Sequence, residues 1–205
     1  MRQHKFANYY EYRRAQRRGS MRRSGRSSTA SAEEIRIISD DVKSHVVDFA
    51  PHGICHGARC GTEVQLFRDQ FPESPADHLF GTDLIGREKL VLAWDFSQRN
   101  KDWVGQFDFI YTNSLDHASN PKRVIRVWLE QLKPTGRLYV TWSTYHKLDE
   151  RELPYPGGDC FGASLEEYVL LLNKVGRVVD VLFIGVTELN KLYATVVVER
   201  RKPKI

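Results

Sequence analysis

The sequence predicts an α/β fold built on a doubly wound, mostly parallel sheet of seven strands. Short apolar segments typical of strands alternate with amphipathic helical segments from about residue 50 to residue 175. Two strand-like segments, 177–186 and 191–200, then follow one another with only a short gap. Because that gap leaves no room for a crossover helix, we expect these two segments to form an antiparallel hairpin.

The chain of 205 residues divides by charge into a basic arm and linker, residues 1–30, and one domain, residues 31–205. The arm holds nine Lys or Arg residues and one acid, which leaves 22 basic and 25 acidic residues, or −3, in the domain. No apolar run approaches the roughly 18 residues that a membrane span needs. Three scattered cysteines predict no disulfide framework, and we expect a cytoplasmic protein, or an organelle-matrix protein if the arm is a transit peptide.

The N-terminal elements are predicted from local patterns. Residues 3–18 favour a short helix, and the Ser-, Gly- and Arg-rich stretch 19–31 is typical of a flexible linker. Ser31 with Glu34 forms a capping-box pattern ahead of apolar residues spaced by three and four, which predicts a helix over 32–46.

The domain then alternates strands and helices. We expect parallel strands over 52–56, 77–82, 89–94, 107–112 and 136–142. We expect helices over 61–70, 121–132 and 164–175. Ligands in such sheets bind at the carboxyl ends of the strands, so the residues that follow each strand are the candidates for function.

The stretch that follows the first parallel strand allows two interpretations. His52, Cys55, His56 and Cys60 are metal-ligand types, but zinc sites use separated ligand pairs, and Cys55 and His56 point to opposite faces of a strand. The residues from Gly57 to Gly61 fit better as a glycine turn that brings a ligand close to the backbone at a helix start. The glycines would also be explained by a simple chain reversal.

Acidic residues end the next two strands. Asp83 stands where a carboxylate accepts hydrogen bonds from a ribose, and Asp95 stands at the same place on the following strand, with Phe96 beside it. Each acid alone fits a turn or cap. Two acids at successive strand ends after a glycine turn favour a nucleoside site.

With these motifs in this order, residues 50–200 resemble the class I S-adenosylmethionine-dependent methyltransferases, which have a Rossmann-like sheet. Gly57-x-Arg59-x-Gly61 resembles the family's glycine-rich first motif, and 107–121 and 132–143 resemble its fourth- and fifth-strand motifs. The terminal hairpin resembles the family's reversed seventh strand. Two departures stand out: Cys55 replaces the usual acid, and Arg59 replaces the middle glycine, where it is suited to pair with the methionine carboxylate or with a surface acid.

The resemblance implies S-adenosyl-L-methionine as cofactor and methyl transfer as the activity. The residues that match its cofactor-binding positions are Gly57, Ala58, Arg59, Gly61, Asp83, Leu84, Asp95, Phe96, Asn113, Ser114 and Leu115. Leu115 is expected on the adenine side. No metal is expected.

Three residues are candidates for catalysis: His117, Asp116 and His146. An imidazole titrates near neutrality, which suits a general base for a hydroxyl acceptor. Asp116 and His117 also fit as caps of the helix that starts near Pro121. His146 lies in the long connection 144–163, a length typical of a functional lid. The other lid candidates are Tyr145, Tyr155, Asp159 and Phe161.

The 113–121 and 159–168 segments resemble small methyltransferases of glycan and cell-envelope pathways, so we expect O-methylation of a glycan, a glycoconjugate or a small hydroxylated acceptor. An RNA-modifying methyltransferase and a non-catalytic Rossmann-like binding protein are the alternatives. The basic arm is suited to a polyanion or an anionic membrane surface, and equally to a solvated tail. Its aromatic residues Phe6, Tyr9, Tyr10 and Tyr12 are expected to dock on the domain or on a second copy.

Overall fold

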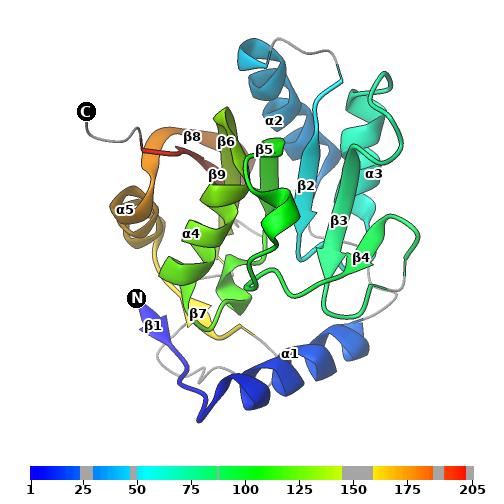
Figure 1. Cartoon of the computed structure of the whole chain (residues 1–205). Coiled ribbons are helices and arrows are strands. Elements are labelled where there is room, and N and C mark those ends of the chain that lie inside the picture. Colours follow the sequence, from blue (N-terminus) through cyan, green and yellow to red (C-terminus); the bar gives the residue numbers. More distant parts are fainter. Residues whose placement is uncertain (24–29, 47–49, 87, 145–158, 187–191, 202–205) are drawn as a thin grey trace.

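The computed structural model describes residues 1–23, 30–46, 50–86, 88–144, 159–186 and 192–201 (Figure 1). Its main sheet has seven strands in the order β4-β3-β2-β5-β6-β9-β8. They are β2 (Gly53–His56), β3 (Leu79–Asp83), β4 (Val91–Ala93), β5 (Phe107–Thr112), β6 (Leu132–Ser143), β8 (Arg177–Val186) and β9 (Leu192–Glu199). The predicted α/β class and the number of strands are confirmed.

The order of strands confirms the predicted C-terminal hairpin. β8 and β9 pair antiparallel, and β9 inserts between β8 and β6, also antiparallel. The pairs β4–β3, β3–β2, β2–β5 and β5–β6 are all parallel. β9 is therefore the reversed strand of an otherwise parallel sheet.

Helices cover both faces of the sheet, as Figure 1 shows. They are α2 (Ala32–His45), α3 (Thr62–Gln70), α4 (Pro121–Gln131) and α5 (Leu165–Val175). Alternation along β5 separates the two cores: Phe109 and Tyr111 pack with α2 and α3, whereas Ile110 packs with α4 and α5. All three side chains are fully buried. The predicted helix positions differ from these by at most a few residues.

The Ser31 cap predicted for this helix is confirmed. The Ser31 side chain accepts a hydrogen bond from the backbone N–H of Glu34 at 3.1 Å. The Glu34 carboxylate is buried, where it accepts hydrogen bonds from Tyr111 and the hydroxyls of Thr141 and Thr195 and also interacts with the Ser31 backbone. Burial raises the pKa of Glu34. This carboxylate therefore joins α2 to the sheet.

The N-terminal segment differs most from its prediction. The expected helix over 3–18 is wrong at both ends: α1 runs from Tyr9 to Arg23, and residues 2–3 form strand β1 (Arg2–Gln3). Asn8 explains the start, since its side chain accepts from the backbone N–H of Glu11 at 3.0 Å. The predicted linker over 19–31 is wrong for residues 19–23, which are helical.

β1 pairs antiparallel with a second short strand that the sequence did not predict, β7 (Phe161–Gly162). Together they hold the start of the chain against the domain, and α1 then crosses the carboxyl ends of the parallel strands (Figure 1). In the parts of the chain described, no helix is long and apolar enough to cross a membrane.

Candidate functional site

The register of the sheet brings the candidate residues to one edge. His56 pairs with Thr82 on one side and with Thr112 on the other, so β2, β3 and β5 end at the same level. Gly57, Asp83 and Asn113 each follow directly after these residues. Asp83 in turn pairs with Ala93, two residues before Asp95.

The turn after β2 needs its glycines. Gly57 has φ +80° and Gly61 has φ +74°, a region that favours glycine. A Cβ atom on Gly57 would lie 2.5 Å from Oγ and 2.6 Å from Cβ of Ser114. Arg59, which replaces the family's middle glycine, also has positive φ, at 33°. The turn therefore brings the backbone of Gly57 close to Ser114, and α3 begins directly behind it with no side-chain cap at its N-terminus.

The metal interpretation of this stretch does not fit the geometry. Cys55 packs with α2 and α3, whereas the His56 ring stacks on Trp128 of α4, with centroids 5.5 Å apart. His56 is held between the Thr82 hydroxyl and the Gln131 amide oxygen, both at 2.8 Å. Burial lowers its pKa to about 4, so the ring is neutral and structural.

Cys55 cannot replace the charge of the acid that the family carries at this position. Burial, with the nearby Glu63, raises the pKa of the thiol well above its usual range. The thiol therefore stays protonated, and the candidate charge for the methionine end of a cofactor on this turn is Arg59, which lines the pocket.

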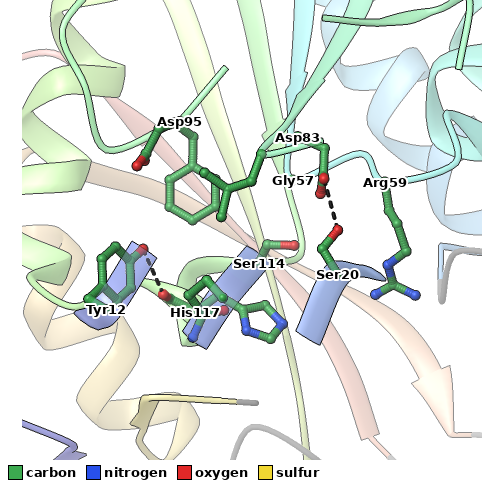
Figure 2. A pocket seen from close by; sticks show the side chains of 11 residues that line it. Tyr12, Ser20, Gly57, Arg59, Asp83, Asp95, Ser114 and His117 are labelled. Atoms are coloured by element: carbon green, nitrogen blue, oxygen red, sulfur yellow. Dashed lines mark hydrogen bonds between the residues drawn. The ribbon is translucent and has the colours of Figure 1, made fainter. Parts of the chain in front are cut away.

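The two carboxylate oxygens of Asp83 differ in how many hydrogen bonds they already accept. Its Oδ1 accepts from the backbone N–H of Ile85 at 3.0 Å and from the Ser20 hydroxyl of α1 at 2.8 Å (Figure 2). These two donors occupy both lone pairs of Oδ1. Oδ2 accepts no hydrogen bond from the residues described.

Asp95 is arranged differently. Its Oδ1 accepts from the backbone N–H of Ser97 at 2.9 Å and from the Ser97 hydroxyl at 2.6 Å. Its Oδ2 accepts from the Tyr9 hydroxyl of α1, which itself accepts from the Gln98 side chain at 2.7 Å. Burial and the neighbouring carboxylate of Asp95 raise the pKa of Tyr9. One lone pair of Oδ2 remains for a further donor.

The pocket is also lined by His117, in the short 3-10 helix η2 (Leu115–His117). Its Nε2 lies 3.9 Å from Oδ2 of Asp116 and 3.8 Å from Oδ1 of Asp159. The Tyr12 hydroxyl of α1 donates to the His117 carbonyl oxygen at 3.1 Å (Figure 2). The three ligand-type groups of Asp116, His117 and Asp159 lie within 4.8 Å of one another, which also suits a divalent cation.

These residues surround one pocket of about 500 Å³, part of it open to solvent. The sequence-predicted residues that line it are Gly57, Arg59, Asp83, Leu84, Asp95, Phe96, Ser114 and His117. Ala58, Gly61, Asn113 and Leu115 are not on its wall. Leu115 was expected beside the adenine, but it is fully buried in the core under α4 because η2 turns its side chain inward.

The pocket has a roof that the sequence analysis missed. Tyr12, Gln16 and Ser20 of α1 line it from above the strand ends. Their spacing of four residues places them on one helix face, a signal present in the sequence. The aromatic arm therefore docks on the domain itself: Tyr12 is 2% exposed, although Tyr10 remains 72% exposed.

The residues expected in the lid have different outcomes. Tyr145, His146 and Tyr155 lie outside the described residues. Asp159 lies beside His117, as given above, whereas Phe161 is buried in β7 and stacks on Tyr168 at 5.4 Å. Phe161 is therefore a core residue rather than an acceptor contact.

No protein-family model and no curated protein matches the sequence. Solved structures match its fold at low identity. The 1,6-didemethyltoxoflavin-N1-methyltransferase of Burkholderia thailandensis is similar over 97% of this chain and 93% of its own, with TM-score 0.71 and 17% identity. The fold is that of the class I S-adenosylmethionine-dependent methyltransferases.

Two further structures show how widely this fold is used. A sugar N-methyltransferase from Streptoalloteichus sp. ATCC 53650 is similar over 98% of this chain and 96% of its own, with TM-score 0.55 and 13% identity. The cyclase SpnF is similar over 82% of each chain, with TM-score 0.56 and 16% identity. Since the same fold carries methyl transfer and cyclisation, function must be argued from the site.

Proposed function

We propose that this chain is an S-adenosylmethionine-dependent methyltransferase that methylates a hydroxyl group of a glycan or of a small hydroxylated acceptor. The observation that carries the proposal is the convergence of Gly57, Asp83, Asp95 and His117 on one pocket at the carboxyl ends of the strands. Bound S-adenosylmethionine supplies a methyl group already activated by a positive sulfur, so the protein has mainly to position the acceptor and exclude water.

The pocket fits the adenosyl group by its own chemistry. Gly57 and Ser114 both line the pocket, and the missing side chain of Gly57 lets the two backbone segments pack closely there, because a Cβ atom would lie 2.5 Å from the Ser114 hydroxyl oxygen. Oδ2 of Asp83 is open to a ribose hydroxyl, and Oδ2 of Asp95 retains a lone pair for an adenine amino group. Arg59 lines the same pocket and supplies positive charge for a carboxylate.

His117 is the general base in this proposal. A ring nitrogen of His117 would take the proton of the acceptor hydroxyl, and Asp116 and Asp159 would stabilise the imidazolium that forms; the cofactor would supply the methyl group and leave as S-adenosylhomocysteine. α1 covers part of the pocket through Tyr12, Gln16 and Ser20.

Calorimetric titration with S-adenosylmethionine, S-adenosylhomocysteine and NAD tests the cofactor. We expect binding of the first two only, and its loss in Asp83→Ala. Asp77→Ala is the matched control, because Asp77 is exposed just before the other end of β3. Failure of both sulfur compounds to bind the unaltered protein would refute the proposal.

An amine acceptor is the second candidate, because two of the similar structures are N-methyltransferases. A neutral amine needs no base, whereas a hydroxyl does. With an acceptor in hand, we expect His117→Ala to lower the rate by roughly 10²-fold or more while cofactor affinity changes little. A rate that is unchanged in this variant would favour the amine.

The cluster of Asp116, His117 and Asp159 makes a metal-assisted reaction testable as well. If His117 acts as a base, methyl transfer will persist after dialysis against EDTA. Loss of activity that Mg²⁺ or Mn²⁺ restores would instead assign the cluster to a metal.

A further inference from the structure

α1 carries four arginines that no carboxylate of the described chain neutralises. Arg13, Arg14, Arg17 and Arg18 are exposed, and none forms an ion pair with a residue that the structure describes. Like charges four residues apart destabilise a helix, so the row has no structural benefit of its own.

The four arginines border two separate grooves. Arg13 and Arg17 flank the side of α1 that faces Trp94 and Asp95, where the adenine is expected. Arg14 and Arg18 flank the opposite side. There they line a groove with His4 and Phe6, and with Arg22 and Glu11 of the same helix. We call this second site the acceptor-side groove.

Backbone hydrogen bonds connect the acceptor-side groove to the catalytic end of the pocket. The N–H of His4 donates to the Cys160 carbonyl oxygen at 2.8 Å, and the N–H of Cys160 donates to the Asp116 carbonyl oxygen at 2.8 Å. β1 and β7 reinforce this connection. The acceptor-side groove is therefore linked through Cys160 to Asp116, the residue before His117.

We propose that the acceptor-side groove binds a phosphate or diphosphate group of the methyl acceptor through Arg14 and Arg18. This inference rests on the proposed function and names the acceptor as a phosphate-bearing molecule. Arg14 and Arg18 lie about one helical turn apart, with their Cα atoms about 6 Å apart along the axis, so that their guanidinium groups can reach one phosphate or a diphosphate. The rings of His4 and Phe6, with centroids 4.5 Å apart, form a wall for the remainder of the acceptor.

The charge distribution favours a small anion over a nucleic acid. Residues 31–205 carry 22 basic and 25 acidic residues, so the surface beyond the arm is not basic overall. The four unpaired arginines span only about 8 Å of helix. A long polyanion gains affinity from many phosphate contacts along an extended basic track, which this helix does not provide by itself.

Binding of sodium pyrophosphate to the full chain, measured by calorimetry, tests the groove. We expect saturable 1:1 binding that Arg14→Gln/Arg18→Gln weakens by roughly tenfold or more, since two charge-assisted contacts are lost. Arg13→Gln/Arg17→Gln is the matched control: it removes the same charge from the same helix on the other flank, and we expect a change of less than about threefold. Absence of pyrophosphate binding, or equal weakening by both pairs, would overturn the inference.

Two further probes identify the source of the phosphate. A single-stranded RNA of 20 nucleotides that binds far more tightly than pyrophosphate and depends on both arginine pairs would overturn the small-anion site. Flotation with phosphatidylglycerol vesicles that depends equally on both pairs would also overturn it. Titration with S-adenosylhomocysteine runs in parallel on every variant. If the unaltered protein binds pyrophosphate but not S-adenosylhomocysteine, the proposed function is refuted and the anion site is still supported.

Discussion

Replacing Ser20 by alanine will tighten the binding of S-adenosylmethionine. The Ser20 hydroxyl and the N–H of Ile85 fill both lone pairs of Asp83 Oδ1. A ribose that donates one hydroxyl to each oxygen of Asp83 must therefore displace Ser20. The competing bond is absent from the alanine variant, so the cofactor no longer has to break it.

The size of the effect follows from the strength of that bond. A hydrogen bond to a charged group contributes about 1.5–3 kcal/mol, and the lower end applies here because Ser20 is only half-buried. Since about 1.4 kcal/mol corresponds to a factor of ten, we expect Kd to fall roughly tenfold.

Calorimetry with S-adenosylmethionine on the two proteins measures the change, and Tyr9→Phe is the control. The Tyr9 hydroxyl uses only one lone pair of Asp95 Oδ2, so an adenine amino group binds beside it and Kd should move by less than about threefold. Unchanged or weaker binding by Ser20→Ala would show that Ser20 stays on Asp83 in the complex and supports the carboxylate instead of blocking it.

Two other substitutions have equally specific expectations. Gly57→Ala should abolish cofactor binding measured by calorimetry, because the new Cβ atom would lie 2.5 Å from the Ser114 hydroxyl oxygen. Gly105→Ala is the control: it also places alanine at positive φ, +70°, but no atom lies within 4 Å of its new Cβ, so cofactor binding should be retained. His56→Gln should flatten the pH dependence of stability. The folded pKa of about 4 lies below the unfolded value of 6.5, so stability is lost as the pH falls between these values, by about 3 kcal/mol. Urea unfolding at pH 7.5 and 4.5 will show this loss in the unaltered protein, and an equal loss in the variant would contradict the assignment.

The core of the fold was predictable because its signals are local. The glycine turn at residues 57–61 follows a strand and precedes a helix within a short stretch, and Asp83 and Asp95 each end a strand. Parallel pairing then aligns these ends without further information, since His56 pairs with Thr82. The antiparallel hairpin was predictable for the same reason, because a gap too short for a helix excludes a parallel crossover.

What the sequence did not reveal depends on contacts distant along the chain. β7 is two residues long and exists because residues 2–3 pair with it across about 160 positions. Leu115 matched the adenine position of the family motif, yet η2 turns it into the core beneath α4. Neither the β1–β7 pairing nor the burial of Leu115 follows from the hydrophobic periodicity of the sequence, because each depends on segments that are distant in the sequence and adjacent in the fold.

The roof of the pocket was missed for a more instructive reason. Hydrophobic periodicity identifies helices that cover an apolar core, but α1 covers a polar cavity. Its inward face is made of Tyr12, Gln16 and Ser20, and the hydroxyls of Tyr12 and Ser20 donate to a carbonyl and a carboxylate of the site. Gly19 and Ser20 look like linker residues in the sequence because this face is polar. The arginines on both flanks hide the pattern further, because they give the segment the composition of a solvated tail. In such a helix the informative feature is a stripe of small polar and aromatic residues at intervals of four, bounded by charge on each side, and that feature predicts a roof over a ligand site.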